Sequence, residues 1–331
     1  MWPFACAYNN SQTQKTNYMK KVYLALAALS LSATVASAQA YIGETEYATL
    51  QDAVTAAEDG AVIEIAGTVN TANTDNTRLG FGKNLTIKGR GDNAVLQLPD
   101  KFKKGTVALL HNTNHTVTFE NLTFDGRGYE REKSFIEAKS GNGTLNLTDV
   151  TVINNKMIAA QRLLDTTGSG AKAVFTNLVI KDCEFLEGLY PIRVGGNKLT
   201  FKGNCEIQEG VNFEPGETKP LYYITVEDLT NTTPIAINFD SANTKYTQGG
   251  VIVKGCNDPS KFKSLVKGYT FEADGDNLKI AEASTTGIEG VEADENAPVE
   301  YYNLQGVRVA NPENGIFIRR QGAKVEKVYV K

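Results

Sequence analysis

Four charged residues stand out because they recur in short apolar segments whose spacing is nearly constant. Glu137, Asp165 and Arg193 lie in segments that start 27 to 29 residues apart, and Arg162 opens the segment that contains Asp165. Two carboxylates on opposite sides of a cleft are the acid and base that cleave a glycosidic bond. The four residues are therefore our candidate catalytic set. The competing interpretation is that mixed charges keep an exposed sheet face soluble.

A second group of charged and aromatic residues fills the loop that begins at Asp125. Its carboxylate is of the type that binds a cation, and Arg127 or Arg131 is a candidate base. Tyr129 in the same loop, and Tyr190 further along the chain, offer aromatic faces to a sugar. Asp125, Arg127, Tyr129 and Tyr190 are thus our candidate ligand-binding residues. The sequence favours a simpler role, a solvated loop in which Asp125 caps a turn, because runs of charge are usually exposed.

Composition argues against several other classes of site. The 331 residues have a formal charge of −4, and no segment is basic enough to indicate nucleic-acid binding. The two histidines, His111 and His115, lie on an expected strand–turn–strand, where a spacing of four does not direct both at one zinc ion. The sequence also contains no phosphate-binding loop, nucleophile elbow or redox cysteine pair.

The elements that must position the candidate residues are short strands in a repeat. Segments beginning at Val117, Leu145 and Val174 lie 28 and 29 residues apart and alternate apolar residues with Thr or Asn. Alternation indicates a strand with one buried face, and a fixed repeat of such strands indicates a solenoid. One coil cannot bury its own apolar face, whereas stacked coils can. The sequence therefore predicts an all-β solenoid.

Polar residues recur where the strands of this repeat must bend. Asn121 and Asn177 stand at matching places, and Asp149 occupies the same place between them. Such side chains bond the backbone groups that a turn leaves unpaired. We interpret all three as structural.

A short helix is expected to cap the N-terminal end of the solenoid. Thr49 is a candidate N-cap, Leu50, Ala53 and Val54 fall on one face, and Gly60 is the expected stop. The cap answers a physical need, because an uncovered terminal coil exposes an unpaired strand edge.

The run 47–65 resembles the entry of right-handed parallel β-helix proteins of the pectate-lyase-like superfamily, and 85–89 and 121–126 resemble its coils. The resemblance implies a right-handed parallel β-helix solenoid over 41–281. That fold carries lyases, hydrolases, adhesins and inert scaffolds, so it says little about activity. A lyase of this kind holds calcium on carboxylates and uses Arg or Lys as base. Calcium is thus the one cofactor that an enzyme would imply.

The first 38 residues are expected to be an upstream extension and a signal peptide. A basic region starts at Met19, the expected true start, and an apolar run leads to small residues before a cleavage site after Ala38. That run is too short and too rich in Ala and Ser to span a membrane. The sequence predicts export and no transmembrane segment in the mature chain.

The C-terminal tail differs in composition from the solenoid. Residues 282–298 form an acidic linker, and 299–331 carry six basic residues, three acidic ones and three expected strands. The stretches 301–309 and 314–318, with a Lys-ending final strand, closely resemble the C-terminal sorting domain of type IX secretion. The resemblance implies contact with that secretion machinery and placement at the outer cell surface or outside the cell.

Export permits disulfides, and Cys183 and Cys205 are placed to lie on adjacent coils. Pairing would leave Cys256 free, and the alternative is that all the thiols are unpaired.

These observations together predict a secreted or cell-surface β-helix that binds polysaccharide or surface glycans as a non-catalytic adhesion scaffold. The alternative is a polysaccharide lyase or glycoside hydrolase acting on the face that carries Asp165, and a third possibility is a purely structural surface protein.

Overall fold

The computed structural model divides into two compact units, Met1–Ala281 and Glu282–Lys331. It describes residues 39–72, 78–100, 106–110, 114–138, 141–158, 162–166, 171–195, 199–213, 222–242, 246–283, 297–322 and 324–330, without the side chains of 78 and 108–110. The expected signal peptide lies outside these residues. No helix in the described part of the chain is long and apolar enough to cross a membrane.

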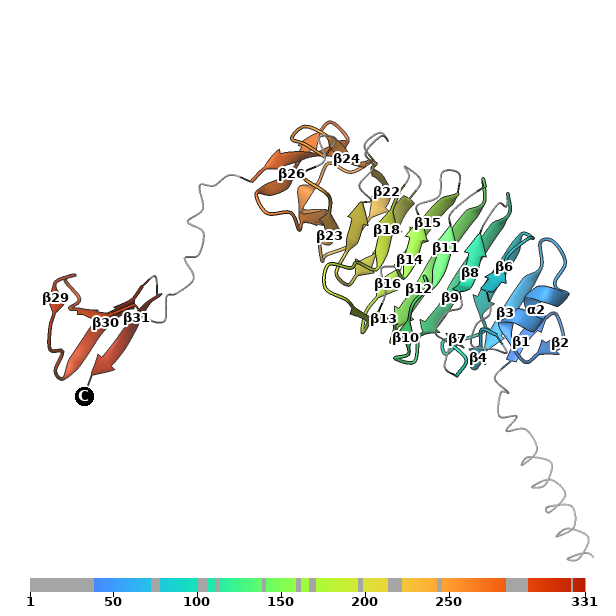
Figure 1. Ribbon diagram of the computed structural model, residues 1–331, viewed down its shortest axis with the longest axis horizontal. Helices are drawn as coiled ribbons and strands as arrows, with labels where there is room; N and C mark the ends of the chain where they lie inside the picture. Colours follow the sequence, from blue (N-terminus) through green and yellow to red (C-terminus); the bar gives the residue numbers. More distant parts are fainter. Residues whose placement is uncertain are drawn as a thin grey trace, which may run out of the picture. The chain divides into compact units, whose positions relative to one another are not determined.

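The first unit is a β-solenoid of about six turns, built around one long sheet (Figure 1). From β3 to β24 its neighbouring strands pair in parallel. The strands in spatial order are β2 (Thr45–Tyr47), β1 (Gln39–Ile42), β3 (Val62–Ala66), β6 (Leu85–Gly89), β9 (Thr116–Asp125), β12 (Thr144–Ile153), β15 (Lys172–Thr176), β19 (Leu199–Gly203), β22 (Ile224–Leu229), β24 (Val251–Lys254), β27 (Asn277–Glu282) and β26 (Tyr269–Asp274). Shorter strands continue this sheet beyond a bend: β4 (Thr68–Asn70), β7 (Val95–Gln97), β16 (Val179–Ile180) and β20 (Glu206–Ile207).

A second, lateral sheet closes the solenoid, and its strands follow one another along the molecule (Figure 1). In order they are β25 (Phe262–Ser264), β23 (Ile235–Asn238), β21 (Val211–Phe213), β18 (Ile192–Val194), β14 (Leu164–Thr166), β11 (Ile136–Ala138), β8 (Thr106–Leu110) and β5 (Arg78–Gly80). A small third sheet, which the sequence did not predict, contains β10 (Glu130–Arg131), β13 (Lys156–Met157) and β17 (Glu184–Phe185). The expected all-β solenoid of parallel strands is confirmed.

The repeat is more regular than the segment starts indicated. Ile136 pairs with Leu164, and Leu164 pairs with Ile192, so the register is 28 residues at both steps. The expected strand opening at Arg162 is therefore wrong by two residues, because β14 begins at Leu164. Arg162 precedes the strand, as Tyr190 precedes β18.

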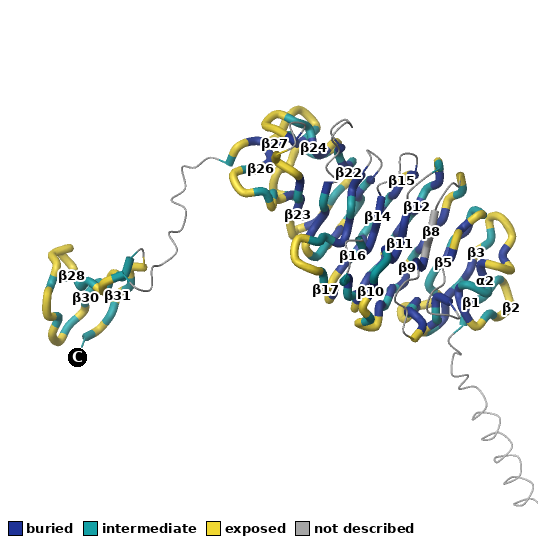
Figure 2. Tube along the Cα trace, viewed as in Figure 1, coloured by how far each residue is buried: buried dark blue, intermediate teal, exposed yellow. Residues whose placement is uncertain are grey.

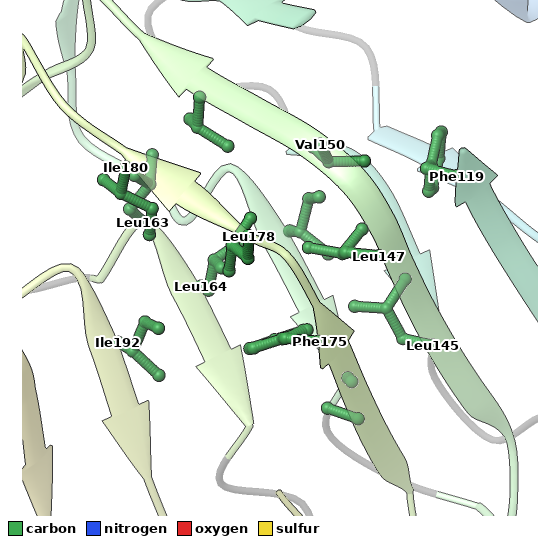
Figure 3. Packing of buried hydrophobic residues seen from close by; sticks show 14 of the residues in the cluster. Phe119, Leu145, Leu147, Val150, Leu163, Leu164, Phe175, Leu178, Ile180 and Ile192 are labelled. Atoms are coloured by element: carbon green, nitrogen blue, oxygen red, sulfur yellow. The ribbon is translucent and has the colours of Figure 1, made fainter. Parts of the chain in front are cut away.

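The core runs as a continuous apolar column through the solenoid (Figures 2 and 3). In β12 the apolar residues alternate between buried and half-buried positions, as a strand with one inner face requires. Figure 3 shows Leu145 and Leu147 of the long sheet and Leu164 and Ile192 of the lateral sheet among the packed side chains of the interior. Aromatic rings extend the packing, and Phe119 meets Phe124 edge-on at 5.1 Å between centroids.

The bends within the long sheet are left-handed. Asn121, Asp149 and Asn177 have φ of 50°, 51° and 52°, a conformation in which Asn and Asp are tolerated best among residues other than Gly. The Asn177 side chain donates to Asp149 Oδ1 at 2.8 Å and accepts from the Asn204 backbone N–H at 2.8 Å. The side-chain bonds expected at bends are thus present at Asn177.

Both ends of the solenoid are covered. Helix α2 (Leu50–Ala56) caps the N-terminal end, with Thr49 as N-cap accepting from the Asp52 N–H and with Leu50 fully buried. It ends at Ala56, earlier than the expected stop at Gly60, because Ala57 is already extended. At the other end β24 pairs antiparallel with β27, which ends the parallel repeat, and a 3₁₀ turn, η1 (Pro259–Lys261), precedes β25.

The second unit is an antiparallel sheet in the order β29 (Arg308–Val309), β28 (Val299–Tyr302), β30 (Gly315–Gln321) and β31 (Lys324–Val330). The three strands expected in the tail are present, and the two-residue β29 was not expected. None of its described residues is buried. Such a sheet has no core of its own among the described residues.

Candidate functional site

Three of the four candidate catalytic residues form one line on the outer face of the lateral sheet. Glu137 in β11 pairs in register with Asp165 in β14, and Asp165 pairs with Arg193 in β18. We call these three residues the charged column. The Arg193 Nη1 lies 3.9 Å from Asp165 Oδ2. Stacking of the repeat therefore brings together side chains that lie 28 residues apart in sequence.

Arg162 belongs to a second line, directly before the strands. It lies near Tyr190 and Arg193, since both contribute to its electrostatic surroundings, and Tyr190 in turn lies near Glu209. Burial and then the positive charge of Arg193 lower the pKa of Arg162. Burial raises the pKa of Tyr190. Arg162 and Tyr190 thus flank the charged column, one coil apart.

Carboxylates and guanidinium groups differ in burial at this site. Glu137 and Asp165 are 6% and 1% exposed, whereas the Arg193 side chain is 26% exposed and Arg162 is half-buried. A buried carboxylate beside an arginine neutralises and orients that arginine, and does not itself meet a large substrate. The groups this face offers to solvent are therefore the two arginines and Tyr190.

The loop that begins at Asp125 is a structured turn. Asp125 Oδ1 accepts the Arg127 backbone N–H at 2.7 Å and the Asn154 side-chain amide at 3.0 Å. Arg127 has φ of 56°, so the carboxylate holds a left-handed turn. The geometry matches the turn-capping role that the sequence favoured for Asp125.

Arg127 and Tyr129 lie together in that loop, around Asp100. The Arg127 Nη1 lies 2.7 Å from Asp100 Oδ1, and the Tyr129 hydroxyl donates to the same oxygen at 3.2 Å. The Arg127 guanidinium also lies over the Tyr129 ring, at 5.0 Å from its centroid. Tyr190 lies elsewhere, beside Arg162, so the four candidate ligand-binding residues do not form one site.

Arg131, the other candidate base, points into the interior. It is fully buried in β10, donates to the Lys133 and Ser134 carbonyls at 3.3 Å, and lies 5.0 Å from the Phe135 ring centroid. Burial lowers its pKa to about 9. A side chain with no exposed surface cannot reach a polysaccharide, so the role of base proposed for Arg131 is wrong.

Metal ligands and thiols are easily stated for the described residues. Among them, no three His, Cys, Asp or Glu side chains gather in a metal-binding arrangement, and His111 lies outside them. The calcium site of a lyase therefore stays a prediction. Cys183, Cys205 and Cys256 are unpaired, and burial raises the pKa of Cys183 to about 11.

The lateral sheet adds polar residues that the sequence did not indicate. Asn212 in β21 pairs with Arg193, and Asn238 in β23 donates to Asn212 Oδ1 at 2.7 Å, so the polar line continues beyond the charged column. The step from Arg193 to Asn212 is 19 residues instead of 28, and this irregular coil hid them. Continuing the period past β18 could not have found them.

Comparisons with protein-family models, with curated proteins and with solved structures gave no match. The class that the fold and the geometry define is a β-solenoid with a polar lateral face.

Proposed function

We propose that this protein binds glycans on its lateral sheet, as an exported, non-catalytic adhesion scaffold. One observation supports this most directly: the charged column presents arginines and buries carboxylates. Arg162 and Arg193 are the partly exposed cations, and Tyr190 lies beside Arg162. Guanidinium groups form paired hydrogen bonds with carboxylate or sulfate, and a tyrosine ring packs against a sugar. The favoured ligand is a glycan with acidic sugars.

Glu137 and Asp165 have a supporting role in this proposal. Their charges offset the repulsion between two nearby arginines and keep both guanidinium groups facing outward. The arrangement is fixed by parallel strand pairing and does not depend on a loop closing.

The alternative is a polysaccharide lyase on the same face, and one observation favours it. The pKa of Arg162 is lowered, which is the change that an arginine needs to act as a base. The burial of both carboxylates argues against acid–base hydrolysis by that pair.

The deciding experiment is to titrate the protein with acidic and neutral polysaccharides in calcium-containing buffer. Binding and the release of unsaturated products or reducing ends would be followed together. We expect binding of acidic glycans without turnover, and at least a tenfold weaker affinity in Arg162→Ala and Arg193→Ala. The matched control is Arg90→Ala, which removes an exposed arginine of the long sheet that pairs with Glu64 at 2.6 Å. Turnover that disappears in Arg162→Ala would establish the lyase instead, and equal binding by all variants would reject this site.

Export is the second part of the proposal. The basic and apolar stretch after Met19 supports passage through the inner membrane. The antiparallel sheet β28–β31 is a separate unit, as a sorting domain read by the type IX secretion machinery needs to be. The expected location is the outer cell surface or the medium.

A further inference from the structure

The outer face of the long sheet carries a continuous line of uncharged side chains across six neighbouring strands. All six are half-buried and alternate with buried residues, so they lie on the outer side of the sheet. Strand register aligns them as Thr86, Thr118, Asn146, Val174, Thr200 and Thr225. We call this line the uncharged track.

The adjoining outward line carries charge only toward its ends. Lys88 pairs in register with Glu120 at one end, and at the other the Lys202 Nζ lies 2.5 Å from Glu227. Between them stand Thr148 and Thr176, again paired in register. The centre of the face is therefore uncharged over two adjacent lines.

This pattern is unusual for an exposed sheet. Long charged side chains normally cover such faces because they keep the protein soluble and prevent edge pairing and stacking. Here short hydroxyl and amide groups replace them, and each can donate and accept hydrogen bonds. Asn146 donates to Thr118 Oγ1 at 3.1 Å, which links two neighbouring strands on the track.

The dimensions of the track select the kind of partner. Six strands at about 4.8 Å spacing give a length of roughly 24 Å, and two lines of side chains make a strip on the order of 250 Å². A stable protein complex buries about 800 Å² on each partner, so a second copy of this chain or another protein would need far more area. A narrow, straight, uncharged strip of hydroxyl and amide groups fits a linear polymer that carries hydroxyl groups and no charge.

We infer that the uncharged track binds a neutral polysaccharide chain lying along the solenoid axis. The inference rests on the proposed function, glycan binding, and adds a second site with a different ligand class on a different sheet. Binding at one track is weak, and many chains on an insoluble polymer surface raise the retained fraction.

The test mixes the full chain with insoluble cellulose, chitin and β-1,3-glucan, and measures the protein left in solution. Thr118→Lys and Val174→Lys each place a long cation on the track, as Lys172 and Lys202 already occur on this face. Thr123→Lys is the matched control, because it makes the same change on the outer side of β9 beyond the bend. Thermal unfolding of each variant checks that the solenoid is intact.

We expect retention on at least one of these polymers, reduced at least fivefold by Thr118→Lys and Val174→Lys and unchanged by Thr123→Lys and Arg193→Ala. Absence of retention on all three polymers overturns the inference, as does an equal loss in Thr123→Lys. Acidic-glycan binding that persists in such a case would leave the proposed function standing. Retention on neutral polymer without acidic-glycan binding would do the reverse.

Discussion

The residues under the greatest conformational demand are those at the bends of the long sheet. Asn177 adopts φ of 52° and makes two side-chain hydrogen bonds, one to Asp149 and one from the Asn204 backbone. Left-handed backbone costs an ordinary residue about 1–2 kcal/mol, and each lost hydrogen bond about 1 kcal/mol. The bend residue therefore stabilises the fold in two separable ways.

We predict that Asn177→Ala destabilises the solenoid by about 2–3 kcal/mol and that Asn177→Gly costs less, because glycine tolerates the left-handed backbone. Within a regular strand the order would be the reverse, since glycine is the poorer strand former. Urea unfolding of both variants measures the order. A larger loss in Asn177→Gly would show that backbone conformation is not what this residue supplies.

The charged column shows why residue type alone misleads. Glu137 and Asp165 have the chemistry of an acid–base pair, yet both are buried beside arginine-bearing coils. The same sequence pattern therefore supports cation presentation better than hydrolysis. Only the exposed fractions of the side chains separate the two roles.

At the scale of elements, the coils stack so closely that some positions admit no side chain. A Cβ on Gly89, at the end of β6, would lie 1.9 Å from the Asn121 carbonyl oxygen and 2.7 Å from the Ala94 Cβ. Gly82, three residues before β6, has nothing within 4 Å of its would-be Cβ. The two glycines differ in surroundings within one coil.

Gly89→Ala is expected to destabilise the solenoid by about 3 kcal/mol, because the backbone of the next coil must move away. Gly82→Ala is expected to stay within about 0.5 kcal/mol of the parent chain. Chemical denaturation of the two variants side by side makes the comparison. Equal stabilities would mean that the coils are not packed as closely as described.

At the scale of the whole molecule, the division into two units makes sorting and folding separable. The solenoid has its own continuous core and covered ends, whereas the tail sheet contains no buried residue among those described. A sorting unit of this kind can be removed without opening the core of the solenoid.

Deletion of residues 299–331 is expected to abolish export to the cell surface while shifting the unfolding midpoint of the solenoid by less than about 2 °C. Cell fractionation and thermal unfolding measure the two effects. Asn177→Ala is the converse control, since it lowers the unfolding midpoint and keeps the tail. Surface export of the truncated chain would contradict the sorting role.

The sequence by itself determined the parts of this protein that rest on local periodicity. Alternation of apolar and polar residues identified strands such as β9 and β12, and the repeated Asn and Asp residues located the bends. Thr49 and the apolar face after it located α2. These signals are local because side-chain direction along a strand or helix depends only on nearby backbone geometry.

Tertiary structure decided what the coils place side by side and how deeply each group is covered. The exact register of 28 moved Arg162 out of β14 and next to Tyr190, and a 19-residue step added Asn212 to the polar line. The burial of Asp165 and Arg131 depends on neighbouring coils, which no single segment specifies. Chemistry at this surface therefore follows from stacking, because burial and distance are properties of several coils together.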